Sequence, residues 1–374
     1  MNSTDKLFLL DAYALIYRAY YAFIKTPRIN SKGFNTSAIL GFVNTLEEVL
    51  KKENPTHIGV AFDPSGPTFR HEAFDQYKAQ REETPEAIRL SVPIIKDIIK
   101  AYRIPILEVA GYEADDVIGT LATKAGEQGI TTYMMTPDKD YGQLVSENVF
   151  MYRPKHDRGF EVMGIEEIKS KFDIESPSQV IDMLGLMGDS SDNIPGCPGV
   201  GEKTAQKLIK EFGNIENLLE HTDELKGALK SKVETNREMI VFSKFLATIK
   251  IDVPISLKME ELIREKIDEE ALRGIFEELE FRTLIERVLK KENSISSPTP
   301  QKKLSAGPLF DNNEDISAGP LFSGKEVPAQ GSLFPEMPGN LSGGSKKTNL
   351  ECLNILNQNY QLIDNKDKRA NLIQ

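Results

Sequence analysis

Nine acidic residues in five separate segments are the strongest candidates for chemistry in this chain. They are Asp11, Asp63, Glu113, Asp115, Asp116, Asp138, Asp140, Asp189 and Asp192. Carboxylates gathered at one place repel one another or acquire raised pKa values unless cations neutralise them. Carboxylate oxygens suit Mg²⁺ or Mn²⁺, and two such ions can activate water and stabilise the departing oxygen of a phosphodiester. The set therefore predicts a two-metal hydrolytic site that needs no covalent nucleophile.

Each acidic segment also has an ordinary structural interpretation. A single aspartate after a strand commonly caps a helix or lies in a turn. Glu113, Asp115 and Asp116 could merely complement a helix N-terminus, whose dipole favours negative charge. Asp138 and Asp140 would also fit a solvated turn. The metal-site hypothesis is favoured only if the fold brings all five segments to one edge of one sheet.

Three short apolar runs end in these acids and predict the strands that position them. The runs cover residues 7–10, 58–62 and 131–136. Continuous apolar runs separated by helical patterns are typical of buried parallel strands in an α/β domain. Ligands of such sheets bind beyond the carboxyl ends of the strands, where Asp11, Asp63 and Asp138 would lie.

Helical patterns account for most of the remaining chain up to residue 291. Residues 113–125 carry apolar side chains at helical spacing. Further helices are expected at 178–188, 202–212, 223–247 and 260–291, with a Gly/Pro hairpin at 194–201. Residues 68–85 place Lys78 and Arg81 three positions apart, so that they could share one helical face.

Composition divides the chain into four expected parts. We expect a catalytic domain at 1–172, a helical part at 173–292, a disordered linker at 293–350 and an incomplete domain at 351–374. The linker prediction follows from Ser, Pro, Gly and Lys enrichment, which cannot bury enough surface to offset ordering entropy. The last part resembles the opening of a proofreading-type exonuclease domain, so the chain is expected to be a fragment or truncated product.

Whole-chain composition excludes few functions. The chain has 374 residues, 40% of them hydrophobic, and a net charge of −11. An acidic balance argues against a nucleic-acid partner, but setting aside the nine site carboxylates leaves −2. No apolar run could span a bilayer, which predicts a cytoplasmic protein. A monomer associated with the nucleoid is a further expectation. The two cysteines, Cys197 and Cys352, offer neither a disulfide framework nor a metal-ligand spacing.

Seven motifs in chain order resemble the 5′ nuclease domain of bacterial DNA polymerase I and its flap-endonuclease relatives. They are Phe8-Leu-Leu-Asp11, Ala61-Phe-Asp63, Phe69-Arg70-His-Glu72, Tyr77-Lys78 with Arg81, Gly111-Tyr-Glu-Ala-Asp-Asp116, Pro137-Asp-Lys-Asp140 and Gly188-Asp-Ser-Ser-Asp-Asn-Ile-Pro-Gly196. The resemblance covers about residues 5–290. It implies an α/β PIN-like (5′ nuclease) parallel-sheet domain with a helical arch, followed by an α-helical helix-hairpin-helix module. It also implies a 5′-3′ exonuclease or flap endonuclease that uses two Mg²⁺ or Mn²⁺ ions.

The resemblance also implies roles for individual residues. Asp63, Glu113, Asp115 and Asp116 would hold one ion with Asp11 nearby, and Asp138, Asp140, Asp189 and Asp192 would hold the other. Lys78, Arg81 and Arg70 would supply positive charge to the transition state, an electrostatic role. Without the resemblance, these cations would fit a solvent-exposed helix of mixed charge. Tyr77 would stack on a base of a threaded strand, although a core aromatic needs no such role.

The segment from Gly196 to Ala205 resembles a helix-hairpin-helix signature. Its Gly199 and Gly201 let the backbone approach DNA, and the N–H groups that follow, at Lys203 and Thr204, can hold a phosphate. Lys207 lies one helical turn further on and adds sequence-independent attraction. A K⁺ ion is a further expectation here. The competing interpretation, a nucleotide phosphate loop, fails because Glu202 separates the last glycine from the lysine.

One linker peptide predicts a protein partner. Gln330-Gly-Ser-Leu333-Phe334 is similar to the short peptide by which bacterial replication proteins bind the sliding clamp. Leu333 and Phe334 are apolar anchors that a groove could accept. Five-residue matches arise easily, however, and two upstream Pro-Leu-Phe copies lack the glutamine. Clamp binding therefore stays a hypothesis about this linker.

Three functions remain to be separated. The favoured one is a nuclease acting on 5′ flaps, nicked duplexes or RNA-primed 5′ ends. A catalytically silent module that binds branched DNA is the main alternative, but it would have no need for carboxylates that repel phosphate. A PIN-type ribonuclease would explain the sheet and the acids but not the hairpin.

Overall fold

The computed structural model describes residues 5–155 and 159–289 of the chain. Its strands are β1 (Lys6–Asp11), β2 (His57–Ala61), β3 (Ile106–Leu107), β4 (Thr131–Met135), β5 (Val149–Pro154) and β6 (Phe160–Met163). They form one sheet in the order β3-β2-β1-β4-β5-β6, in which only β6 runs antiparallel to its neighbour. The three strands predicted from apolar runs, β1, β2 and β4, are adjacent at the centre of the sheet and parallel.

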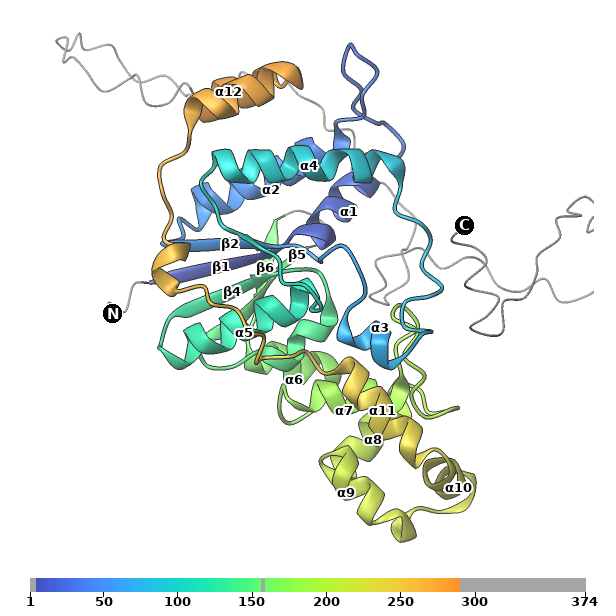
Figure 1. Ribbon diagram of the computed structural model, residues 1–374. Helices are drawn as coiled ribbons and strands as arrows, with labels where there is room; N and C mark the ends of the chain where they lie inside the picture. The colour runs from blue at the N-terminus through green and yellow to red at the C-terminus, as the bar shows by residue number, and fades with distance from the viewer. Residues whose placement is uncertain (1–4, 156–158, 290–374) are drawn as a thin grey trace, which may run out of the picture. The chain divides into compact units, whose positions relative to one another are not determined.

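Helices cover both faces of the sheet (Figure 1). In chain order they are α1 (Ala12–Ala22), α2 (Ser37–Lys52), α3 (Phe69–Ala73), α4 (Glu86–Ala101), α5 (Ala114–Glu127), α6 (Ile165–Phe172), α7 (Gln179–Met187), α8 (Glu202–Phe212), α9 (Ile215–Glu220), α10 (Gly227–Thr235), α11 (Arg237–Ala247), α12 (Glu269–Glu278) and α13 (Arg282–Leu289). Three 3₁₀ helices are η1 (Lys139–Leu144), η2 (Thr222–Glu224) and η3 (Met259–Leu262).

Strand β1 shows why helices must pack against both faces of the sheet. Its residues Leu7 and Leu9 pack in one hydrophobic cluster with α5, whereas Phe8 and Leu10 pack in another with α1, α2 and α4. All four side chains are fully buried, because successive strand residues point to opposite faces. Figure 1 shows the two helical layers above and below the sheet, with α12 lying over α4.

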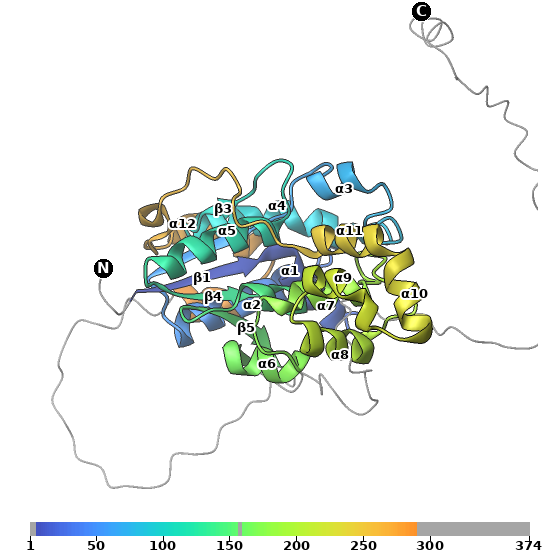
Figure 2. The ribbon, with the colours of Figure 1, turned by 90° about the horizontal axis from the view of Figure 1, so that it is seen from below.

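Five helices, α7 to α11, form a separate helical part next to the sheet domain (Figure 2). Helix α8 spans the range predicted from sequence, and α7 falls within its predicted range. The helices predicted at 223–247 are α10 and α11, which meet around Asn236. The range 260–291 contains α12 and α13, separated at Glu280 with a φ of 63°, but α12 begins only at Glu269.

The segment expected to carry Lys78 and Arg81 on a helical face is mostly not helical. Only α3 forms there, over five residues, and turns follow it until α4 begins. Lys78 has a φ of 55°, a left-handed conformation that interrupts any helix. The shared-helix prediction was therefore wrong, although the two side chains still reach the same partner.

The linker, the terminal part and the clamp-like peptide with Gln330, Leu333 and Phe334 lie outside the described residues. Within those residues, no helix is both long and apolar enough to cross a membrane.

Candidate active site

The predicted carboxylates meet at the carboxyl-terminal edge of the central strands. Asp11 is the last residue of β1, Asp63 lies two residues beyond β2, and Asp138 lies three beyond β4. These positions follow from the parallel register, since adjacent strands end at the same edge. A cleft of about 490 Å³ opens there. Eight of the nine carboxylates line it: Asp11, Asp63, Glu113, Asp115, Asp138, Asp140, Asp189 and Asp192.

Backbone caps hold two of these acids in place. Asp11 caps α1 through a 3.1 Å hydrogen bond from Ala14 N to its Oδ1. Its other oxygen accepts hydrogen bonds from the hydroxyls of Thr136 and Tyr141, at 3.2 and 3.3 Å. Asp63 Oδ1 accepts a 2.7 Å hydrogen bond from Ala114 N at the start of α5. Both acids therefore orient helices as well as lining the cleft.

Asp116, predicted as a metal ligand, does not line the cleft, although its carboxylate lies within 4.8 Å of those of Glu113 and Asp115. Its carboxylate is fully buried and accepts four hydrogen bonds. Two come from Arg70 Nη1 and Nη2, and two from the backbone N–H groups of Glu113 and Lys250. These hydrogen bonds engage both carboxylate oxygens. Asp116 therefore orients the Arg70 guanidinium and the backbone at Glu113 and Lys250.

Arg70, predicted to supply positive charge to the transition state, does not line the cleft and is buried beside its acids. The residue is 1% exposed, and its five N–H donors are all used. Three go to the carboxylates of Glu113 and Asp116, and two to the backbone carbonyls of Leu246 and Thr248. Sequence position alone could not separate this buried cation from the nearby Lys78 and Arg81.

Lys78 and Arg81 do line the cleft and both pair with its carboxylates. Lys78 Nζ lies 2.7 Å from Glu113 Oε1 and 3.6 Å from Asp192 Oδ2. Arg81 Nη2 lies 2.5 Å from Asp192 Oδ1. Burial opposes ionisation of both acids, but Lys78 and Arg81 hold the pKa of Asp192 below its ordinary value, and Lys78 and Arg70 do so for Glu113. The two cations are thus held at the mouth of the cleft by its own acids.

Tyr77 is not available as a stacking surface, contrary to its prediction. Its side chain is 3% exposed, so neither ring face is open to a base. Its hydroxyl lies 2.9 Å from Glu113 Oε2 and 3.1 Å from Asp192 Oδ2. Tyr77 therefore bridges two carboxylates that come from different parts of the chain.

Five other cleft carboxylates lie in an environment that disfavours their charge: Asp11, Asp63, Asp115, Asp138 and Asp140. Burial, followed by repulsion from Asp63, raises the pKa of Asp11 to about 7. Burial and neighbouring carboxylates also raise the pKa of Asp115 and of Asp140 well above the ordinary value. Asp140 Oδ1 is buried with no hydrogen-bond partner among the described residues. A buried oxygen without a partner, in a cleft whose carboxylates outnumber its cations, fits a hard divalent cation.

The cleft contains residues that the sequence analysis missed. They are Tyr13, Ala14, Tyr17, Pro64, Ser65, Glu82, Thr84, Lys96, Glu108, Ala114, Lys139, Tyr141 and Ser191. Lys139 is the most informative, since its Nζ lies 2.7 Å from Asp189 Oδ2. Its position between Asp138 and Asp140 was a signal that could have identified it.

The helical part contributes to the cleft through the hairpin after α7. A bridge between Asp189 and Ile194 closes this turn and directs Asp189 and Asp192 toward the sheet domain. Gly188 and Gly196, at φ 74° and 62°, pack so closely that a Cβ on Gly196 would lie 2.3 Å from Gly188 N. Gly201 precedes α8, on which Lys203 and Lys207 are exposed.

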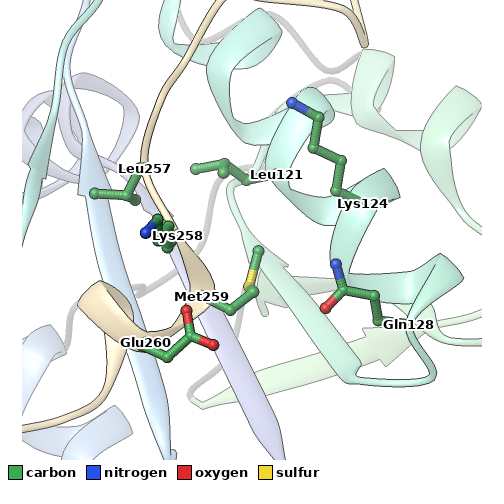
Figure 3. Close-up of a pocket in the computed structure, with 7 residues that line it drawn as sticks. All are labelled: Leu121, Lys124, Gln128, Leu257, Lys258, Met259 and Glu260. Atoms are coloured by element: carbon green, nitrogen blue, oxygen red, sulfur yellow. The ribbon is translucent and has the colours of Figure 1, made fainter.

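A second hollow of about 250 Å³ lies between α5 and η3 (Figure 3). It is lined by Leu121, Lys124, Gln128, Leu257, Lys258, Met259 and Glu260. None of the predicted site residues lines it, so the acidic cleft remains the candidate active site.

An acidic cleft beyond parallel strands, flanked by cations that can meet a phosphate, defines the class of divalent-metal-dependent enzymes that act on phosphate esters. The family is given by two matching family models. Residues 6–173 match the 5′-3′ exonuclease N-terminal resolvase-like domain, and residues 175–270 match the 5′-3′ exonuclease C-terminal SAM fold. The chain belongs to the 5′-3′ exonuclease family, which confirms the family and enzyme class predicted from its motifs.

Individual relatives agree with this assignment. The chain is 38% identical over 284 residues to a 5′-3′ exonuclease of Aquifex aeolicus, covering 76% of this chain and 95% of that protein. It is 43% identical over 291 residues to DNA polymerase I of Bacillus subtilis, covering 77% of this chain. The match spans only 33% of that polymerase, so the chain covers about a third of the polymerases it resembles.

Solved structures show the same fold. A T5 5′-exonuclease with bound zinc matches with a TM-score of 0.56 and 21% identity, over 73% of this chain and 98% of that one. The catalytic core of Rad2 in complex with a DNA substrate matches with a TM-score of 0.50 and 17% identity, over 73% and 87%. The predicted nuclease fold, a PIN-like domain followed by a helical module, is confirmed.

Proposed function

We propose that this 5′-3′ exonuclease hydrolyses DNA phosphodiesters near 5′ ends, at 5′ flaps and nicks, with two divalent cations bound in the acidic cleft. The observation that carries the proposal is the convergence of eight carboxylates with Lys78 and Arg81 in one cleft. A protein that only bound DNA would be repelled by such a cluster unless cations neutralised it. RNA-primed 5′ ends belong to the same proposed substrate class.

The proposed ion sites follow the two groups of acids. Asp63, Glu113 and Asp115, with Asp11 nearby, would hold one Mg²⁺ or Mn²⁺, and Asp138, Asp140, Asp189 and Asp192 would hold the other. Glu113, Asp115 and Asp116 offer oxygens within 4.8 Å of one another, but those of Asp116 are already occupied by hydrogen bonds. When bound, the two ions supply an activated water and offset charge on the departing oxygen.

The chain's own cations would bind the phosphate. Lys78 and Arg81 have carboxylate partners in the cleft and would exchange part of that pairing for phosphate oxygens when DNA enters. Tyr77 would keep Glu113 and Asp192 in position during this exchange, because its hydroxyl lies within hydrogen-bond distance of both. Lys139 would orient Asp189 in the same way.

The hairpin and α8 would bind duplex DNA beside the cleft. The N-terminus of α8, with Gly199, Gly201 and Thr204 before or within its first turn, offers backbone N–H groups to a phosphate. Lys203 and Lys207 are exposed on the same helix and would add attraction that weakens with salt. A K⁺ ion at this turn is part of the same proposal.

The wider role proposed for the chain is that of the N-terminal part of a DNA polymerase I. Its identity of 43% to the first third of such a polymerase supports this role. Primer removal and nick processing in the cytoplasm, near the nucleoid, would follow. Binding to a sliding clamp through Gln330, Leu333 and Phe334, and a monomeric state, are further proposals; a peptide of residues 328–336 without clamp affinity would overturn the former.

Cleavage of a 5′-labelled flap duplex tests the central proposal. Product sizes would be read on a denaturing gel in Mg²⁺, in EDTA, and with the double variant Asp115→Asn/Asp140→Asn. Asp97→Asn is a matched control, because Asp97 is an exposed residue of α4 that pairs with Lys100 and lies outside the cleft. Cutting near the junction that needs metal and both acids is expected. Flap binding without cutting in Mg²⁺ or Mn²⁺ would favour a catalytically silent DNA-binding module.

A further inference from the structure

The segment at the end of α11, residues 246–250, is held to the sheet domain by side chains that form hydrogen bonds with its main chain. Arg70 donates hydrogen bonds to the carbonyls of Leu246 and Thr248, at 2.9 and 2.8 Å. Asp116 accepts one from Lys250 N at 2.8 Å. Such contacts fix the path of a segment regardless of its own side chains, because they use only main-chain groups.

Gln143 supplies the remaining contacts to this segment, which we call the α11 exit. Its Nε2 donates to Ala247 O at 3.0 Å, and its Oε1 accepts from Ile249 N at 2.9 Å. The other Nε2 hydrogen bond goes to Asp140 O, also at 3.0 Å. Gln143 is 8% exposed and therefore has little water to replace these partners.

Gln143 and Arg70 thus join the α11 exit to two different groups of cleft carboxylates. Gln143 lies on η1 and grips the main chain of Asp140. Arg70 is connected to Glu113, which belongs to the other group of carboxylates. It donates a hydrogen bond to the Glu113 carboxylate and another to Asp116, which accepts one from Glu113 N. Asp140 and Glu113 come from segments that are far apart in the sequence. Both are connected to the α11 exit, which can therefore fix their positions relative to each other.

The α11 exit is also continuous with the helical part of the molecule. Helix α11 packs beside α7, the helix that leads into the hairpin carrying Asp189 and Asp192 (Figure 2). Ser243 on α11 accepts a 2.9 Å hydrogen bond from Gly196 N in that hairpin. A displacement of α11 would therefore reach the hairpin, Asp140 and Glu113 together.

We propose that Gln143 is a positioning residue that, with Arg70, aligns the two groups of metal-binding carboxylates by tying both to the α11 exit. Gln143 does not line the cleft and would not touch the substrate. Its effect would pass through the position of Asp140 relative to Glu113. The inference rests on the proposed two-metal function, and it assigns the helical part a second role besides DNA binding.

Gln143→Met tests this role, because methionine keeps the volume and removes all three hydrogen bonds. Gln179→Met is a matched control. Gln179 also makes three hydrogen bonds to backbone groups, with Gly213 O, Glu175 N and Ser176 N, but none of them touches the cleft or the α11 exit. If Gln143→Met does not fold, Gln143→Asn replaces it in the test. Asparagine keeps the amide but is too short to reach both Asp140 and the α11 exit.

Four readouts separate positioning from general stability. For Gln143→Met we expect kcat to fall and the calorimetric Kd for Mn²⁺ to rise, each by about 10- to 100-fold, the range seen for outer partners of metal ligands. KM for a flap duplex should change by no more than about twofold, because DNA contacts are untouched. Hydrogen exchange of a peptide covering residues 246–250 should slow on Mn²⁺ addition in wild type and Gln179→Met, but not in Gln143→Met.

The outcomes distinguish this inference from the proposed function. Unchanged kcat and Mn²⁺ affinity in folded Gln143→Met, or in Gln143→Asn, would overturn the positioning role while wild-type cutting still supported the nuclease. Equal losses in Gln179→Met would show a general stability effect and would also overturn it. Wild-type protein that binds flaps without cutting would contradict the proposed function, whereas Mn²⁺ binding and hydrogen exchange would still test the alignment.

Discussion

Arg70 and Asp116 form a buried ion pair in which both nitrogens of the guanidinium fork meet both carboxylate oxygens. Nη1 lies 2.8 Å from Oδ2, and Nη2 lies 2.8 Å from Oδ1. Paired, hydrogen-bonded charges of this kind are tolerated in a protein interior, but either partner alone is not. The pair therefore makes the position of α5, and of Glu113 before it, depend on α3.

Removing the cation of this pair should destabilise the protein strongly. Arg70→Met leaves Asp116 buried without its partner, so we expect the free energy of unfolding to fall by about 3–5 kcal/mol. Urea unfolding in EDTA would measure this loss without a contribution from metal binding. Lys100→Met, which removes an exposed pair with Asp97, should cost at most about 1 kcal/mol. A similar small loss for both variants would contradict the structural role of Arg70.

Lys78 should matter more for turnover than for folding. Lys78→Met removes a cation that lies 2.7 Å from Glu113 Oε1 in the cleft, and should lower kcat by about 10²–10³, as for other groups that stabilise transition-state charge. KM should rise less than kcat falls. Steady-state cutting of a flap duplex measures both, with Lys100→Met as the control. A variant with full kcat and a raised KM would show that Lys78 only helps DNA to bind.

Metal-free protein should lose stability as the pH rises. The folded-state pKa of Asp11 is about 7, raised by burial and then by Asp63, so between its ordinary value of 3.8 and about 7 the folded chain holds a proton that the unfolded chain releases. The free energy of unfolding therefore falls through this window, and the cost is complete above pH 7. Thermal unfolding in EDTA at a series of pH values measures it.

The variant Asp11→Asn isolates this contribution. The amide oxygen can still accept the hydrogen bond from Ala14 N, while the charge is removed. In EDTA at pH 8 the variant should therefore have a higher Tm than wild type, and Mg²⁺ should raise the wild-type Tm more than that of the variant. Asp97→Asn should change neither value. An Asp11→Asn protein that is less stable in EDTA would contradict the assigned pKa.

Alanine substitutions of two glycines, one in the hairpin and one in α12, should have opposite effects on stability. Gly196→Ala would place a Cβ 2.3 Å from Gly188 N at a φ of 62°, so it should destabilise the hairpin by more than about 1 kcal/mol. Gly274→Ala lies in α12 with open space around the new Cβ, and should stabilise by about 0.5–1 kcal/mol. Urea unfolding of both variants is the measurement. Equal effects at the two sites would show that backbone packing does not distinguish them.

The local sequence was sufficient to predict an element where the residues of that one segment define it. The apolar runs of β1, β2 and β4 are followed within two residues by acids, and parallel pairing alone then brings Asp11, Asp63 and Asp138 to one edge. Helix α8 begins directly after Gly201 because glycine and the charged turn define its start without help from other segments. Motif order further indicated the family, which the family models confirm.

Only the tertiary structure decided which charged residues face the cleft. Arg70 and Lys78 are both cations of the segment 68–85, and Asp115 and Asp116 are neighbours on α5. Yet Arg70 and Asp116 turn inward and pair, whereas Lys78 and Asp115 line the cleft. The direction of each side chain depends on what packs against its helix, here the carbonyls and amides of the α11 exit. Those groups lie more than a hundred residues away, so no local pattern could reveal them.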